Sequence, residues 1–423
     1  MTSPDRSDIE SDATCRSCGR IGLEMFLSLG DMPLPNAFVH PDDVGRVDER
    51  FPLDVAFCPA CRLVQLVSDV PTERMFRYRY LYLSSFSDEL LRHSRQHALE
   101  LIETCGLGPE SFVVELASND GYLLRNFVEA GIPAIGIDPA PEPAEAARKL
   151  GVETIQEFFG HELARRLGTE RRRADVIIAN NVMAHVSDLN DFVGGMAELI
   201  ADDGLITVEN AYVRGLIDHT EFDTIYHEHV CYYSCTSVAS LVERHGLHLN
   251  DVRPFPALHG GTLRWRISRI PGRSERLEAF LRDEQTCGLN DAGYYRGFGE
   301  RVEQLRADLL ELLHRLRKEG RSIAAYGAAA KGTVLLNYAG IGPDLIDYVV
   351  DRNVYKHGHF MPGVRIPIVG TERLIEDLPD YTLLLAWNFA DEIVRQQDAY
   401  MRGGGRFIVP VPVPRVLYPE PAA

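Results

Sequence analysis

The sequence contains no hydrophobic run that approaches the roughly 18 residues needed to cross a membrane. Its first 13 residues are polar and acidic, a composition that argues against a secretory signal. These two absences predict a cytoplasmic protein that has no membrane partner.

Positive charge is also scarce. The 44 Lys and Arg residues stand against 62 Asp and Glu residues, which gives a formal net charge of −18. Proteins that bind nucleic acid neutralise phosphates with a basic face, so we expect no nucleic-acid partner. A small anionic ligand stays compatible with this charge because it needs only a few local cations or backbone N–H groups.

Cysteines are few, with eight in 423 residues, which is not the content of a disulfide framework. Four of them form two C-x-x-C pairs, Cys15 with Cys18 and Cys58 with Cys61. Two such pairs are typical of a tetrahedral zinc site, and four thiolates leave no open position. We therefore expect a structural zinc ion. The alternatives are four unrelated thiols or a redox pair.

The apolar runs that do occur are short and alternate with helical patterns. They lie at 112–116, 134–137, 176–179 and 205–208, and again at 323–326, 345–350, 383–387 and 407–411. This alternation predicts α/β domains whose parallel sheets are covered on both faces. A long amphipathic helical segment, 275–318, separates the two series. The resulting domain prediction is 13–70, 71–272 with a helical N-terminal part, and 273–423.

The segment 112–124 reads as strand, loop and helix, which is where a doubly wound sheet binds a nucleotide-like ligand. It lacks the G-x-G-x-x-G pattern of dinucleotide sites. The acidic strand end, Glu115, would repel a diphosphate but suits a cofactor with a positive amino or sulfonium group. We therefore predict S-adenosylmethionine, held by Glu115 and by the loop residues Ser118, Asn119, Asp120 and Gly121.

Further cofactor contacts are expected at the ends of the following strands. Asp138 lies 23 residues after Glu115, where a carboxylate can accept hydrogen bonds from ribose hydroxyls. Phe158 would flank the adenine, and Asn180 and Asn181 end the fourth strand. The alternatives are a Rossmann-like domain that binds NAD and one that binds nothing.

A polar quartet, Tyr226-His227-Glu228-His229, follows these strands. Histidine is the side chain best matched to proton transfer near neutral pH, and a neighbouring carboxylate raises its basicity. The quartet therefore predicts an acid/base site. A metal cluster that includes His185, or a role in surface or packing, are the alternatives.

Three other segments suggest ligand contacts. In 326–332 a strand leads through small residues to Lys331 at a helix start, an arrangement that suits phosphate. The segment 77–82 mixes arginines and tyrosines, so that a base could stack on Tyr80, although an aromatic helix face would look similar. Two glycines in 259–264 permit an unusual turn or a plain hairpin entry.

In this order the motifs resemble the sugar C-methyltransferases of deoxysugar biosynthesis. The resemblance extends from Cys15 to about residue 411 and includes the paired cysteines and the segments 31–38, 115–124, 226–229, 259–264, 326–337, 351–357 and 362–367. It implies a small zinc-binding domain, a central Rossmann-like class I methyltransferase domain and a C-terminal Rossmann-like domain. It also implies a nucleotide-linked 4-keto-deoxysugar, commonly dTDP-linked, that is methylated at C3, and a place in deoxysugar and antibiotic biosynthesis.

The resemblance places Tyr226, Glu228 and His229 at the reacting carbon, with His185 nearby. It assigns Tyr80 to the nucleotide base, and Lys331 and Arg352 also stand as substrate contacts. Removing a proton next to a ketone needs a base and donors to the enolate oxygen. We expect His229 to be the base; an O- or N-methyltransferase, or a catalytically silent zinc-containing binding protein, are the alternatives.

Overall fold

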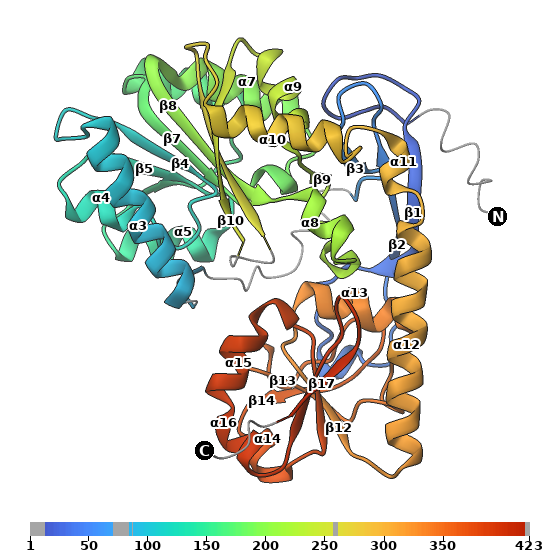
Figure 1. Ribbon diagram of the computed structural model, residues 1–423. Coiled ribbons are helices and arrows are strands. Elements are labelled where there is room, and N and C mark those ends of the chain that lie inside the picture. The colour runs from blue at the N-terminus through green and yellow to red at the C-terminus, as the bar shows by residue number, and fades with distance from the viewer. Residues whose placement is uncertain (1–12, 71–83, 87, 257–260, 419–423) are drawn as a thin grey trace.

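The computed structural model describes residues 13–70, 84–86, 88–256 and 261–418 and contains three β-sheets (Figure 1). The N-terminal sheet and the central sheet lie side by side, and the C-terminal sheet lies beyond them. In the described part of the chain no helix combines the length and the apolar character that a membrane span requires.

The N-terminal sheet is antiparallel and takes its last strand from the middle of the chain. Its strand order is β1-β2-β3-β9, and Gln65 of β3 pairs with Cys231 of β9. This pairing ties the segment just after the predicted quartet to the N-terminal domain. The strands are β1 (Glu24–Pro33), β2 (Arg50–Phe57), β3 (Val64–Leu66) and β9 (Cys231–Tyr232), with the 3₁₀ turn η1 (Pro41–Asp43) between β1 and β2.

The central sheet has the order β10-β11-β8-β7-β4-β5-β6. Strands β8, β7, β4, β5 and β6 are parallel, as the alternating pattern predicts, whereas β11 runs antiparallel to both of its neighbours, β10 and β8. The strands are β4 (Val113–Leu116), β5 (Ala134–Ile137), β6 (Glu153–Ile155), β7 (Ala174–Asn180), β8 (Ile200–Ala211), β10 (His248–Phe255) and β11 (Thr262–Ser268).

Helices cover both faces of the central sheet, because successive buried strand residues point to opposite sides. Val113 and Val176 pack in a cluster with α3, α4 and α5, while Val114 and Ile177 pack in the cluster that contains α6, α7 and α9. The helices are α3 (Asp88–Cys105), α4 (Arg125–Glu129), α5 (Pro141–Lys149), α6 (His161–Glu170), α7 (Leu189–Leu199), α8 (Val213–Asp218) and α9 (Cys235–Glu243), with the 3₁₀ turns η2 (Ser84–Phe86), η3 (Met183–His185) and η4 (Phe222–Thr224).

The C-terminal sheet has the order β14-β13-β12-β15-β16-β17 and is parallel except for β17. Its strands are β12 (Ile323–Tyr326), β13 (Val349–Asp351), β14 (Ile368–Gly370), β15 (Tyr381–Leu384), β16 (Arg406–Val409) and β17 (Arg415–Leu417). Its helices are α13 (Ala330–Ala339), α14 (Arg373–Asp377), α15 (Ala390–Gln396) and α16 (Asp398–Arg402), with η5 (Val354–Lys356) and η6 (Trp387–Phe389).

Two predicted strands of this sheet are displaced from the observed ones. The runs 345–350 and 383–387 include buried turn residues, and burial alone does not distinguish a strand from a buried turn.

The predicted long helical segment is three helices: α10 (Glu275–Thr286), α11 (Ala292–Tyr295) and α12 (Phe298–Lys318). Gly288 and Gly297 interrupt it with φ angles of 84° and 74°, a left-handed conformation that glycine adopts without a Cβ clash. Helix α12 contacts both β1 and α13, and it runs along one side of the molecule from the N-terminal sheet to the C-terminal domain (Figure 1).

Candidate active site

Two loops of the N-terminal domain bring the four predicted metal ligands together. The Sγ atoms of Cys15 and Cys61 lie 3.4 Å apart, and those of Cys18 and Cys58 lie 3.7 Å apart. All four sulfur atoms fall within 4.8 Å of one another. Four thiols at these separations fit a tetrahedral zinc ion whose coordination is closed, so the site can hold structure but has no position for a reactant.

Both cysteine loops use the same backbone turn. The amide of Gly19 donates to the Cys15 carbonyl at 2.8 Å, and the amide of Arg62 donates to the Cys58 carbonyl at 2.9 Å. Gly19 and Arg62 have φ angles of 70° and 65°. The second turn therefore holds a non-glycine residue in a left-handed conformation, which costs about 1 kcal/mol.

The loop after β4 is held in an unusual conformation. Ala117, Asn119 and Gly121 have φ angles of 54°, 50° and 76°. A Cβ atom added to Gly121 would lie 3.1 Å from the Val152 side chain. Left-handed non-glycine residues persist only where the surroundings over-determine them, and they cluster at ligand sites. The predicted cofactor loop is thus close-packed and pre-shaped.

Two predicted cofactor residues of this loop bind η2. The side-chain oxygen of Asn119 accepts a hydrogen bond from the Ser84 amide at 2.9 Å, and Asp120 accepts one from the Ser85 amide at 3.1 Å. Ser118, by contrast, is fully buried, and its hydroxyl has no hydrogen-bond partner in the described part of the chain.

Two carboxylates lie at the carboxyl ends of neighbouring strands. Asp138 accepts hydrogen bonds from the backbone amides of Asn119 and Ala140, both at 2.9 Å. Glu115 is 1% exposed, and its Oε2 atom has no partner among the described residues. Burial, followed by the charges of Asp120 and Asp138, raises the pKa of Glu115 well above its usual range. A cationic ligand would relieve this repulsion, so the donor set fits S-adenosylmethionine.

The remaining predicted cofactor residues border the same edge of the sheet. Asn180, at the end of β7, is 8% exposed, and its side-chain oxygen has no partner in the described ranges. Asn181 has a φ angle of 54° and donates its amide to the Glu209 carbonyl. Phe158 is 62% exposed, whereas its neighbour Phe159 packs on the core.

The predicted quartet forms a turn after η4. The Tyr226 hydroxyl lies 2.7 Å from Nε2 of His229, and Nδ1 of His229 lies 3.0 Å from the Thr224 carbonyl oxygen. A carbonyl oxygen only accepts, so Nδ1 carries the proton. Nε2 is then the basic atom and accepts from Tyr226.

His185 meets this pair from η3. Its ring centroid is 4.8 Å from that of His229, and the amide of Val230 donates to the Ala184 carbonyl, which joins the two segments. Burial lowers the pKa of His185 to about 4. Burial and then the proximity of His185 lower the pKa of His229 well below its usual value. Both imidazoles are therefore neutral at pH 7.

The other two members of the quartet point to the N-terminal domain. Glu228 accepts a hydrogen bond from the Asn36 side-chain amide at 2.7 Å, and burial raises the pKa of Glu228. His227 is 2% exposed and lies 3.1 Å from the Phe51 carbonyl oxygen. In the described part of the chain the four cysteines are the only cluster of three or more side chains that could hold a metal, so His185, His227 and His229 do not form one.

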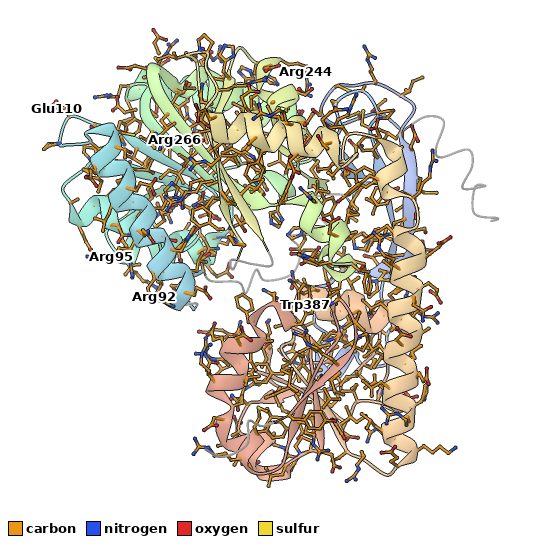
Figure 2. All side chains as sticks on the ribbon, viewed as in Figure 1. Arg92, Arg95, Glu110, Arg244, Arg266 and Trp387 are labelled. Atoms are coloured by element: carbon orange, nitrogen blue, oxygen red, sulfur yellow. The ribbon has the colours of Figure 1, made fainter. Side chains whose placement is uncertain are left out.

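A cation from the C-terminal domain faces this site. Lys331, in the first turn of α13, lies 3.1 Å from the Asn388 side-chain oxygen and 4.7 Å from the Trp387 ring centroid. Trp387 donates its indole N–H to Asp223 at 2.7 Å, and it lies on the side of the C-terminal domain that faces the central domain (Figure 2). Burial raises the pKa of Asp223 to about 7, although the Lys331 charge opposes this shift. Burial likewise lowers the pKa of Lys331.

The C-terminal domain repeats the carboxylate arrangement of the cofactor site. Asp351, at the end of β13, accepts hydrogen bonds from the amides of Ala328 and Asn353, both at 2.7 Å. Asp138 likewise binds one amide from the loop after the adjacent first strand and one amide two residues beyond itself. Both domains thus present a carboxylate fixed by two backbone amides at a strand end.

Of the other predicted substrate contacts, Arg352 lies in the described part of the chain and Tyr80 does not. Arg352 is exposed, and its guanidinium lies 3.9 Å from the Glu392 carboxylate and 3.4 Å from the Gln396 side-chain oxygen. Tyr80 and the rest of 77–82 lie outside the described residues, as do His259 and Gly260.

Sequence reasoning missed four residues of this region. Asn36 and Thr224 hold Glu228 and His229, while Asp223 and Trp387 link the two domains. Asn36 lies inside the segment 31–38, and Trp387 is one of only two tryptophans. Neither feature predicts which residue the side chain contacts. Asp223 and Trp387 are 164 residues apart, a contact that no local spacing indicates.

Three family models match consecutive parts of the chain. A zinc binding domain matches residues 15–76, a methyltransferase domain matches residues 87–252, and a C-methyltransferase C-terminal domain matches residues 257–412. These spans contain the cysteine cluster, the cofactor loop and the Lys331 region, respectively.

One curated relative matches nearly the whole chain, and other proteins match parts of it. The chain is 35% identical to the C-methyltransferase NovU of Streptomyces niveus over 96% of this chain and 97% of that protein. It is 26% identical to a ubiquinone biosynthesis O-methyltransferase of Azorhizobium caulinodans over 29% of this chain and 47% of that protein. A solved magnesium protoporphyrin IX methyltransferase from Synechocystis PCC 6803, with bound S-adenosylmethionine, is 14% identical over 43% of this chain and 82% of its own, with a TM-score of 0.33.

Proposed function

This chain belongs to the zinc-containing, S-adenosylmethionine-dependent C-methyltransferases, and we propose that its acceptor is C3 of a nucleotide-linked 4-keto-deoxysugar. The observation that carries the proposal is the contact between Tyr226 and His229, whose Nε2 atom is unprotonated. Methylation of carbon requires a base positioned to remove a proton next to a carbonyl, and a neutral imidazole of fixed tautomer can accept that proton.

His229 takes the C3 proton on Nε2. The Thr224 carbonyl holds the ring in the tautomer that leaves Nε2 unprotonated, so the C3 proton takes the place of the hydrogen bond from Tyr226, and the same carbonyl stabilises the imidazolium that forms. The low pKa of His229 keeps the base deprotonated before the substrate arrives.

The enolate oxygen needs a donor as the C3 proton leaves. The Tyr226 hydroxyl donates to Nε2 of His229 in the resting enzyme and is released to the enolate oxygen once Nε2 carries the C3 proton, while the ring of His185 lies next to that of His229. A neutral donor at a developing oxyanion typically contributes a factor of about 10² to 10³ in turnover. Glu228, held by Asn36, orients the turn that carries the base.

The cofactor, when bound, supplies an electrophilic methyl group. Glu115 and Asp138 would hold it at the carboxyl edge of the central sheet, with Ser118 and the loop backbone lining the same site. Because β7 and β4 are neighbours in that sheet, His185, which follows β7, is carried to the same edge. Cofactor bound there would lie at the same sheet edge as His185 and its neighbour His229.

The nucleotide part of the acceptor belongs to the C-terminal domain in this proposal. The support is the repeated carboxylate at Asp351, which suits ribose hydroxyls, and the cation Lys331 at a helix start, which suits phosphate. Arg352 and Tyr80 would add a phosphate contact and a stacking surface for the base.

The test is incubation of the full, zinc-loaded chain with methyl-labelled cofactor and a panel of nucleotide 4-ketosugars. NMR of the product should place the methyl group on C3. Without cofactor, the enzyme in D₂O should exchange the C3 proton, and His229→Ala should not. A methyl group on oxygen or nitrogen would replace the proposal with heteroatom methylation. No heat of S-adenosylmethionine binding in calorimetry would favour a silent binding protein.

A further inference from the structure

A cavity of about 380 Å3 lies between α3 and the β8-β11-β10 end of the central sheet. Four arginines line it: Arg253 on β10, Arg264 and Arg266 on β11, and Arg276 on α10. None of the residues predicted for cofactor, catalysis or substrate lines this cavity. Arg264 and Arg266 both point into the cavity because residues two apart on one strand lie on the same face of the sheet.

The cavity holds more positive than negative charge. Two carboxylates line it, Glu100 and Asp251. Arg253 pairs with Glu100 at 2.8 Å, and Arg276 donates to Asp251 at 3.2 Å. Arg264 is turned to Glu209 of β8, which also bonds His93. Each carboxylate is therefore already engaged.

Arg266 is the unmatched cation. Across the described ranges it makes no hydrogen bond or ion pair to another residue, although it is only partly exposed, and it lies within the central domain (Figure 2). Partly burying a guanidinium without a counter-charge is unfavourable. Carboxylates are plentiful in a chain with a net charge of −18, yet none of the described ones pairs with Arg266.

Unpartnered polar groups lie at the inner wall of the same cavity. His97 and Thr207 both line it and are each 1% exposed. Neither ring nitrogen of His97, nor the Thr207 hydroxyl, has a hydrogen-bond partner in the part of the chain that the structure describes. Nδ1 of His97 is 3.7 Å from Glu209, which is beyond hydrogen-bond distance. Buried polar groups are nearly always hydrogen-bonded, so these unpaired atoms indicate a site for a polar ligand.

We propose that this cavity is a binding site for a phosphate-type oxyanion, held by Arg266 with Arg276 and Arg253 and reached from inside by Thr207 and His97. A guanidinium presents paired N–H donors that match the oxygens of a phosphate group, which favours this class over a single-charged halide. The Thr207 hydroxyl and the neutral His97 ring can each donate one further hydrogen bond. The site is separate from the proposed substrate phosphate contacts at Lys331.

The test is calorimetric titration of the full, zinc-loaded chain with inorganic phosphate, against sodium chloride and sodium acetate at matched ionic strength. We expect saturable binding of phosphate and little response to chloride or acetate. Arg266→Gln should weaken phosphate binding by about tenfold or more, because it removes a charge-assisted pair of hydrogen bonds. Arg266→Lys, which keeps the charge without the fork, should be intermediate.

Arg95→Gln is the matched control, since Arg95 is an exposed arginine of α3, the helix that borders the cavity, and loses the same charge (Figure 2). It should bind phosphate as the unaltered chain does. Equal phosphate affinity in Arg266→Gln and the unaltered chain would overturn the proposal, and so would equal responses to phosphate and acetate. An equal loss in Arg95→Gln and Arg266→Gln would reduce the effect to net charge and would also overturn it. Unchanged thermal unfolding of Arg266→Gln without phosphate would show that the loss is one of binding.

Discussion

The hydroxyl of Tyr226 lies 2.7 Å from Nε2 of His229, three residues further along the same turn. The opposite ring nitrogen of His229 is occupied by the Thr224 carbonyl, so the turn fixes the tautomer of its own histidine. Short-range backbone geometry thus determines which ring nitrogen of the proposed base carries the proton.

His229→Ala should abolish turnover while S-adenosylmethionine binding stays within about twofold. Loss of a general base typically lowers turnover by a factor of about 10² to 10⁴. Steady-state kinetics and calorimetry of cofactor binding measure the two quantities. Tyr226→Phe keeps the base and removes one donor, so it should retain more activity than His229→Ala. The reverse order, or near-normal turnover in His229→Ala, would contradict the assignment.

Cofactor affinity should increase with pH through the range above the usual Glu115 pKa of 4.5. Burial and the charges of Asp120 and Asp138 raise the pKa of Glu115, so at low pH its carboxyl is protonated and attracts a cation weakly. Binding of a cationic cofactor then releases a proton. Calorimetry in buffers of different ionisation enthalpy measures that release. Glu115→Gln should bind more weakly and lose the pH dependence, and a parallel pH profile in this variant would exclude Glu115 as the cause.

Asp223→Asn should remove part of the pH dependence of folding stability. The pKa of Asp223 is raised from 3.8 to about 7 by burial, so the folded state binds a proton that the unfolded state releases. Its contribution is complete below pH 3.8 and is lost as pH rises to 7, at most about 4 kcal/mol. Urea unfolding from pH 5 to 8 should show a shallower decline in the variant. Asp203→Asn, an exposed carboxylate on β8, should leave the decline unchanged; an equally steep decline in Asp223→Asn would refute the shift.

Zinc removal should lower both stability and activity. Strand β9 pairs with β3 of the N-terminal sheet directly after His229, so loss of the cysteine cluster loosens the turn that carries the base. A structural zinc site contributes its binding energy to folding. Chelation, or Cys58→Ser, should lower the unfolding temperature and turnover together. Cys105→Ser, at the end of α3 and outside the cluster, is the control. Full activity after complete zinc loss would show that the cluster does not support the site.

Local patterns account for much of the protein. The paired cysteines, the alternation of short apolar runs with helices, and the acidic strand ends Glu115 and Asp138 are all short-range features, because turn geometry and strand or helix periodicity act over a few residues. They predict the domain types, the cofactor loop and the metal ligands. They do not mark strand ends, as the displaced runs 345–350 and 383–387 demonstrate, because buried turns are as apolar as strands.

Long-range partners were decided only by the tertiary structure. Fully buried Glu284 accepts hydrogen bonds from Tyr212 and from the first amides of α9, although nothing in its own segment sets it apart from other helical glutamates. Asp223 meets Trp387, and β9 leaves the central domain to complete the zinc-bearing sheet. Such pairs form because the packing of whole domains brings them together and buried polar groups must then be satisfied. The residue types of the chemistry were thus set by the sequence, whereas their partners depended on how three domains pack around one turn.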